Sequence, residues 1–410
     1  MASYFGWVDF AEEDRKKMMD VIHLFNEPDT RDELGIGTIR DAFADYFFPG
    51  TSTIQTRARY FLFISWIYNA LEDKKVKSKE IAHRLRKEEV KLIKALLSTD
   101  DTHGVIGKRE KEKLQRLPSN IYWAGLGSWG IRTYSGSQNQ YHHYLNTFYI
   151  KKKLMVKNDD NESASGFVKH NWHLGLPESP KDFPKYADLI LTSEEAHYLQ
   201  ERILSQHRKS LLYFLVSADM FEKVDFFWNL PNTITDSLSE TLKKDVQHAH
   251  NFSETMLGAA LLYNLMLAQM QKNDDLIKNY QMQLNDWIKN ISDSHRWKEL
   301  ITWYNDLDGF WTSAALKDAK IPPKTQTFVK MWYKNIFEIK KLILIPENKD
   351  ARELISHREK QLKRNRARLQ NPRALDMWNG SAGNNQLDFR WRTVEKIVQD
   401  ILNGLKEGET

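Results

Sequence analysis

Hydrophobic residues along most of this chain recur three and four positions apart, which is the spacing of one face of an α-helix. Clear examples are the segments 37–48, 78–97 and 191–204. In the third, Thr192 and Glu195 have the spacing of a capping box, in which two side chains close the start of a helix. Alternation of the kind found in strands is weak and confined to Ser3–Phe10. The pattern predicts a mainly α, multi-helix fold with minor β content.

Two segments are apolar nearly all round, YFLFISWIYNAL at 60–71 and the stretch 250–270. A helix that is hydrophobic on every side is buried, so both are predicted to lie in a core. Gly258 in the second segment leaves room for a neighbouring helix to approach closely. The longest apolar run, Met256–Met270, is shorter than the about 20 residues that cross a bilayer. No membrane contact is therefore expected.

Changes in pattern along the chain predict its domains. Residues 151–184 contain three prolines, a polar tract and poor periodicity, which is typical of a linker or long loop. This segment separates a predicted N-terminal helical domain, 1–150, from a central helical domain, 185–345. A proline at position 346 precedes the remaining residues, 346–410, which read as a basic C-terminal helical unit.

Composition narrows the class of protein. The chain has 410 residues and no cysteine, which excludes a disulfide scaffold, a Cys-based zinc site, an iron–sulfur cluster and a cysteine nucleophile. The first residues, MASYFGWVDFAEEDRKK, carry acids where a signal peptide has its apolar core, so a cytoplasmic location is expected. Positive charge gathers in two segments: 73–116 holds 14 Lys and Arg against 8 Asp and Glu, and 351–373 holds 8 against 2. Segregated positive charge is typical of a surface that meets a polyanion or an acidic partner, but for 73–116 a solvated helix face with incidental lysines is the favoured interpretation.

The turn PGTST at 49–53 is a candidate anion site. Thr51, Ser52 and Thr53 are predicted N-caps of the buried helix, with Arg57 and Arg59 one turn further in. A short helix, a turn and a second helix also resemble a helix-turn-helix that would contact nucleic acid. The alternative is a capped core helix whose arginines pair internally, and the apolar run after Arg59 favours it. The expected partners are then Asp32, Glu33, Asp41 or Asp45.

The same four carboxylates are the basis of an alternative hypothesis, that the protein is an enzyme. Asp41 and Asp45 are four residues apart and share a helix face, so with Asp32 and Glu33 they could gather a divalent metal ion. The protein would then be a metal-dependent nuclease or phosphoester hydrolase. No phosphate-binding loop, nucleophile elbow or zinc motif supports this, and the histidine pairs lack further ligands at a suitable spacing. We therefore assign no catalytic residue, metal ligand or cofactor from the sequence.

A basic helix at 351–370 is the stronger binding candidate. Ile355, Leu362 and Leu369 recur every seven residues and form a narrow apolar seam. The remaining faces are predicted to carry exposed cations: Arg358, Lys360, Lys363, Arg364, Arg366 and Arg368. Of these, Arg364, Arg366 and Arg368 are expected to contact the phosphates of a nucleic acid, or an acidic protein partner. A solvated helix that only holds the C-terminal unit is the alternative.

Several long strings resemble an uncharacterised bacterial protein family of about this length. They are DELGIGTIRDAFADYFFPGTSTIQTRARYFLF, GVIGKREKEKLQRLPSNIYWAGLGSWGIR, FSETMLGAALLYNLMLAQ and RARLQN with the ending WNGSAG and LDFRW. The family has no named activity that could be assigned to this chain. Its association with DNA-defence loci indicates a biological setting but no mechanism. The resemblance implies a non-catalytic component of a bacterial DNA-associated or phage-defence complex, which would bind nucleic acid or a protein partner. A purely structural protein–protein adaptor is a further alternative.

Overall fold

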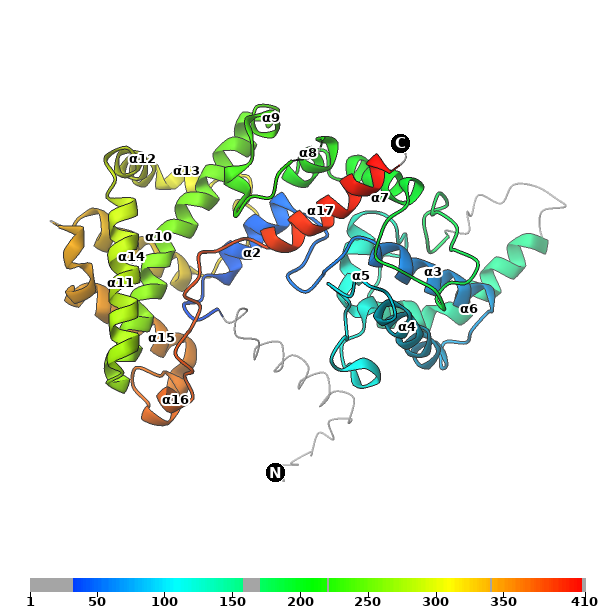
Figure 1. The fold of residues 1–410 in the computed structure, drawn as a ribbon, viewed down its shortest axis with the longest axis horizontal. Coiled ribbons are helices and arrows are strands. Elements are labelled where there is room, and N and C mark those ends of the chain that lie inside the picture. The colour runs from blue at the N-terminus through cyan, green and yellow to red at the C-terminus, as the bar shows by residue number, and fades with distance from the viewer. Residues whose placement is uncertain (1–31, 158–169, 220, 340, 408–410) are drawn as a thin grey trace, which may run out of the picture. The chain divides into compact units, whose positions relative to one another are not determined.

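The computed structural model of the protein describes residues 32–157, 170–219, 221–339 and 341–407. Within them the fold is mainly α, as predicted, and the pairing typical of strands is limited to an isolated bridge between Arg132 and Trp172. The predicted extended segment Ser3–Phe10 lies outside the described residues. Figure 1 shows the helices, coloured from blue to red in chain order.

The described residues form two compact units, each assembled from separate stretches of the chain. Unit 1 comprises residues 32–43 and 243–389, and unit 2 comprises residues 44–242 and 390–407. The chain passes between them within helix α2 (Gly37–Phe47), near the start of α10 (Glu240–Gln271) and before α17 (Trp391–Lys406). The contiguous domains 1–150, 185–345 and 346–410 stay a prediction from the sequence. Residues 151–157, predicted to belong to the linker, continue helix α6.

Unit 1 is built around α10. Its other elements are α11 (Asp274–Ile291), α12 (Ser294–Asn305), α13 (Leu307–Trp311), α14 (Pro323–Phe337), η3 (Leu342–Glu347), α15 (Lys349–Lys363), η4 (Arg364–Arg366) and α16 (Pro372–Asp376). Two tryptophans connect neighbouring helices to α10 by hydrogen bonds. The indole N–H of Trp287 in α11 donates to Glu254 O, and that of Trp332 in α14 donates to Thr255 O. The Trp287 ring occupies the space where a side chain at Gly258 would begin, as the predicted close approach requires.

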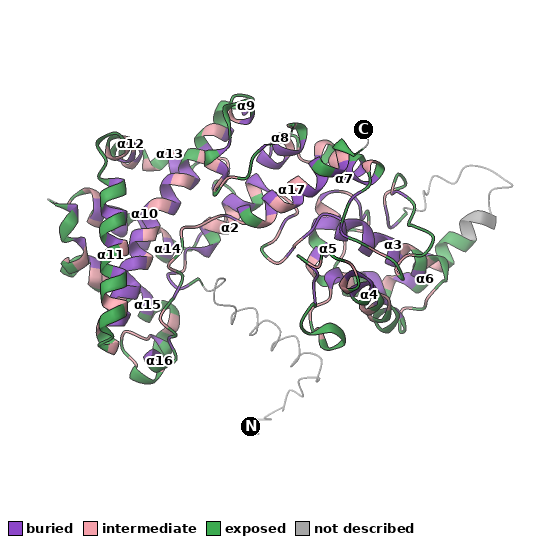
Figure 2. Ribbon diagram, viewed as in Figure 1, coloured by how far each residue is buried: buried purple, intermediate pink, exposed green. Residues whose placement is uncertain are grey.

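Unit 2 is built around α3 (Tyr60–Asp73), which is buried along most of its length (Figure 2). It also contains α4 (Ile81–Leu97), η1 (Lys111–Lys113), α5 (Pro118–Ser128), α6 (Gln138–Lys157), α7 (Ser193–Gln206), α8 (Leu211–Ser217), η2 (Phe227–Asn229), α9 (Asn232–Thr235) and α17. Phe61 of α3 stacks on Trp129 with ring centroids 3.8 Å apart. The last helix, α17, packs on α7, where Gly404 lies against Ala196 and Leu191. The C-terminal stretch of the chain thereby completes the unit that the N-terminal half begins.

Candidate nucleic-acid interface

The turn at 49–53 does not cap a helix, so this part of the prediction was wrong. Helix α3 begins at Tyr60, and residues 51–59 form turns and irregular backbone. The Thr51 hydroxyl donates to Phe48 O at 2.6 Å instead of accepting from a helix N–H. The Gln55 side chain accepts from the N–H of Ser52 and donates to Gly50 O, each at 3.2 Å. The polar residues of Thr51–Thr53 therefore shape a turn, and they present no helix N-terminus to an anion.

Arg57 is a buried cross-link of unit 2, with 4% of its surface exposed. Its Nε donates to both Asp400 oxygens at 3.1 and 2.9 Å, and Nη1 donates to Asp101 at 2.8 Å. Two backbone carbonyl oxygens accept from the same guanidinium. Asp400 also accepts from the N–H of Ala58 at 3.0 Å. The hydrogen bond from Arg57 lowers the pKa of Asp101, which is itself mostly exposed.

Arg59 is likewise buried and paired. Its guanidinium donates to Asp188 at 2.6 Å and to Glu195 at 2.7 Å. Glu195 is also the acid of the predicted capping box at the start of α7, which is present and includes Thr192. Both arginines thus pair internally, with partners 44 to 343 positions away in the sequence instead of the nearby acids that were expected.

The four carboxylates of the enzymatic alternative have other partners. Asp32 accepts from the N–H groups of Ile36 and Gly37 at the start of α2. Asp41 pairs with Arg40 at 3.0 Å, Asp45 pairs with Arg390 at 2.6 Å, and Glu33 pairs with Lys363 and Arg368. Within the described ranges, no group of three or more Asp, Glu or His side chains could hold a metal ion.

The predicted basic helix is shorter than expected. Helix α15 ends at Lys363, where Arg364 takes a left-handed φ of 52° that a continuing helix cannot accommodate. Leu369 therefore lies beyond the helix, and Leu362 is 41% exposed, so the predicted seam of three residues is broken. We call the segment 360–373 the basic turn. It holds six Lys and Arg residues and no acid.

A buried carboxylate, Glu359, makes the chain turn here. Fully buried itself, it accepts from the backbone N–H groups of Arg368 and Leu369 at 2.9 Å each. The Tyr263 hydroxyl and the Lys363 ammonium also donate to it. Burial alone would raise the pKa of this carboxyl, but the hydrogen bonds outweigh burial and the pKa is lowered. The ionised carboxylate therefore fixes the backbone that follows the helix.

Two of the predicted surface cations are drawn into the same network, and a third is buried. Glu33 pairs with Lys363 and, at 3.0 Å, with Arg368. Arg358 is only 4% exposed and donates to the backbone oxygens of Leu34 and Gly35. The prediction that these three cations lie exposed on the helix was wrong. Arg368 holds the basic turn in place and offers little of its charge to solvent.

The remaining cations of the basic turn face solvent. Lys360, Arg364, Arg366 and Arg373 are exposed, and within the described residues none of them makes an ion pair. The amide of Asn371 donates to Asn365 O at 2.6 Å and closes the turn between Arg366 and Arg373. Of the predicted site residues, Arg364 and Arg366 are thus available to a partner. Sequence reasoning missed Arg373, although its position beyond Pro372 at the start of a new helix is visible in the sequence.

Comparison with known proteins identifies the family of this chain, and the function of that family is unknown. The model of a family of unknown function (DUF6361) matches residues 2–404. The chain belongs to this family. Neither the curated proteins nor the solved structures contain a match. No helix in the described part of this family member is long and apolar enough to cross a membrane.

Proposed function

We propose that this protein binds nucleic acid through the basic turn, as a non-catalytic component of a bacterial DNA-associated or phage-defence complex. The observation that carries the proposal is the set of four exposed cations, Lys360, Arg364, Arg366 and Arg373, on a fixed backbone. The setting follows from the family resemblance alone. The four carboxylates of the alternative, a metal-dependent hydrolase, take part in capping and ion pairs, and we therefore favour binding over it.

The chemistry of the basic turn suits a phosphate backbone. Three of its four exposed cations are arginines, whose planar guanidinium can donate two hydrogen bonds to one phosphate. Cations that make no internal ion pair bind a polyanion without first breaking a protein contact. Neutralising phosphates releases condensed counterions, so affinity falls as salt rises. Contacts of this kind are independent of base sequence, and binding is expected to tolerate any sequence.

The test compares two charge reversals of equal size in unit 1. Arg364→Glu with Arg366→Glu alters the basic turn, whereas Lys278→Glu with Lys289→Glu alters two exposed lysines of α11. Binding of a fluorescent DNA duplex is followed by anisotropy between about 50 and 200 mM salt. The control should bind as the wild type does. The basic-turn variant should bind at least about tenfold more weakly, and its log–log salt slope should be shallower by about 2, one for each lost phosphate contact.

Two results would overturn the proposal. One is an affinity of the wild-type protein that does not change with salt, because counterion release would then play no part. The other is an equal loss of affinity in both variants, because the effect would then follow net charge and not the basic turn.

A further inference from the structure

The exposed face of α15 carries charges of opposite sign at its two ends. Asp350, Glu353, Leu354, His357 and Lys360 share this face, and Arg364 follows directly after the last helical residue; we call these six residues the α15 stripe. All are exposed except Leu354, which is half-buried. The opposite face of the helix is buried through Ala351, Ile355, Arg358 and Glu359. The acids therefore precede His357 and the cations follow it on one continuous exposed surface.

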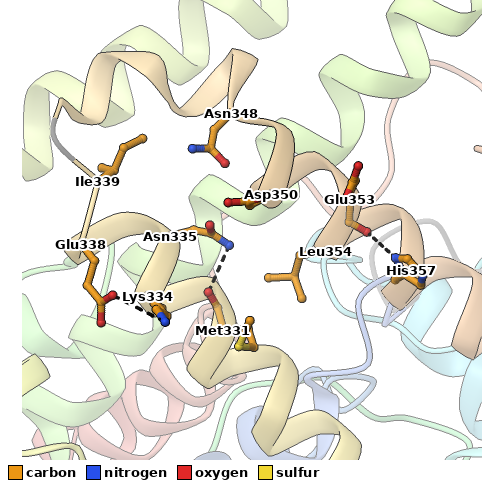
Figure 3. Close-up of a pocket in the computed structure, with 10 residues that line it drawn as sticks. All are labelled: Met331, Lys334, Asn335, Glu338, Ile339, Asn348, Asp350, Glu353, Leu354 and His357. Atoms are coloured by element: carbon orange, nitrogen blue, oxygen red, sulfur yellow. Dashed lines mark hydrogen bonds and ion pairs between the residues drawn. The ribbon is translucent and has the colours of Figure 1, made fainter.

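The acidic half of the α15 stripe borders a groove of about 540 Å³ between α14 and α15 (Figure 3). Three carboxylates, Glu338, Asp350 and Glu353, line it against one ammonium, Lys334. Met331, which is 45% exposed, adds apolar surface, as does Leu354 of the stripe. The groove is thus built for a partner that is both cationic and partly apolar.

We propose that this partner is a second copy of the chain, with α15 packed antiparallel on α15 about a two-fold axis at His357. In such a pair, positions equally far from the axis face each other. Asp350 lies seven residues before His357 and Arg364 lies seven after it. Leu354 and Lys360 lie three before and three after. Asp350 therefore lies opposite Arg364 of the other copy, and Glu353 lies opposite Gln361, next to Lys360.

The facing residues also match in shape. The aliphatic stem of Lys360 lies over Leu354 of the other copy, which leaves its ammonium beside Glu353. Lys360 and Arg364 of each copy thus enter the acidic groove of the other. The 3.7 Å contact between Lys349 and Glu353 is exposed on both sides and is easily exchanged for the new one. A surface shaped only for a foreign cationic partner would not need an acidic end and a basic end on one stripe, and this complementarity favours self-association.

Cross-linking tests the axis directly, because the chain has no cysteine. His357→Cys places the two thiols next to each other across the axis, and mild oxidation of the full-length protein should give a disulfide-linked dimer. Lys278→Cys, on an exposed position of α11, is the control and should remain largely monomeric. Dimer formation by His357→Cys that does not exceed the control would overturn the proposal.

Charge exchange separates a second copy from any other occupant. Glu353→Lys and Lys360→Glu should each weaken the dimer about tenfold or more in sedimentation velocity, because each reversal acts twice across a two-fold axis. The double variant Glu353→Lys/Lys360→Glu re-forms both contacts with reversed signs and should restore the wild-type dissociation constant to within about threefold. A foreign protein or nucleic acid has no matching change, so its binding would stay weak in the double variant. A wild-type chain that remains monomeric at high concentration, or a double variant as weak as the single ones, would overturn the proposal.

Discussion

The pairing of Arg57 with Asp400 predicts that Asp400→Ala is among the most damaging single changes in unit 2. Asp400 is 5% exposed and accepts from Arg57 Nε, from the N–H of Ala58 and from the Lys396 ammonium. Its removal leaves the Arg57 guanidinium buried with Asp101 as its remaining carboxylate partner. Unpairing a buried charge costs about 3–5 kcal/mol, and a buried N–H without an acceptor costs about 1–3 kcal/mol. Since these costs overlap, we expect a loss of about 4 kcal/mol in the free energy of unfolding.

The same arginine supplies the control. Asp101 accepts from Arg57 at 2.8 Å, but its side chain is 52% exposed. An exposed pair contributes about 0.2–1 kcal/mol, so Asp101→Ala should cost less than about 1 kcal/mol. The two variants each remove one carboxylate from Arg57, and the carboxylates differ in burial and in the further groups, Ala58 N–H and Lys396, that donate to Asp400.

Urea unfolding monitored by tryptophan fluorescence and circular dichroism measures both variants. Since Asp400, Arg57 and Asp101 all lie in unit 2, the shift is expected in the transition of unit 2 and not in that of unit 1. Replacing both partners, as in Arg57→Met with Asp400→Leu, should recover more than half of the loss, since no buried charge remains unpaired. Equal costs for Asp400→Ala and Asp101→Ala would refute the reasoning, because burial would then not set the strength of the pair.

Three further outcomes follow from other parts of the structure. Burial raises the pKa of Glu89 to about 8, above its usual 4.5, so between these pH values the folded state keeps a proton that the unfolded state loses. The free energy of unfolding should therefore fall between about pH 4.5 and 8, by up to about 1.4 kcal/mol per pH unit. Glu89→Gln should remove this pH dependence in urea titrations. Gly258→Ala should destabilise unit 1 by about 1–3 kcal/mol in thermal unfolding despite the better helix propensity of alanine, because the new methyl group meets the Trp287 ring. DNA and a second copy both require Lys360 and Arg364, so an excess of duplex should convert dimers to DNA-bound monomers in sedimentation, and stable DNA-bound dimers would contradict the shared surface.

Local pattern predicted the helices and failed at their connections. The helices predicted at 37–48 and 78–97 are observed at Gly37–Phe47 and Ile81–Leu97, and the capping box of Thr192 was visible directly. The start of α3 was placed too early, because the threonines at 51 and 53 resemble caps in sequence. What decides their role is a hydrogen bond from Thr51 to the end of the preceding helix, which no propensity encodes.

The candidate site was only partly predicted, because contacts between residues far apart in the sequence decide which cations are exposed. Arg364 and Arg366 were expected to be exposed and are exposed, whereas Arg368 is held by Glu33, 335 positions earlier in the chain. The break after Lys363 depends on Glu359, whose carboxylate gathers two backbone N–H groups from residues that a continuous helix would carry away from it. Glutamate inside a basic helix is ordinarily read as one more surface charge. Its burial against Tyr263 comes from packing between α10 and α15 and cannot be read from α15 alone.

The contrast between the two arginine-rich segments follows from what lies next to them. Arg57 and Arg59 precede a helix that is apolar on nearly every side, so folding that helix carries both guanidinium groups into the interior, where each needs carboxylate partners. Arg364 and Arg366 follow a helix with one buried face, and no apolar run adjoins them. Folding can therefore leave them in water at no cost. Exposed cations with no internal partner hold an unused capacity to bind anions, which is why the basic turn, and not the more conspicuous PGTST segment, is the better candidate for a binding surface.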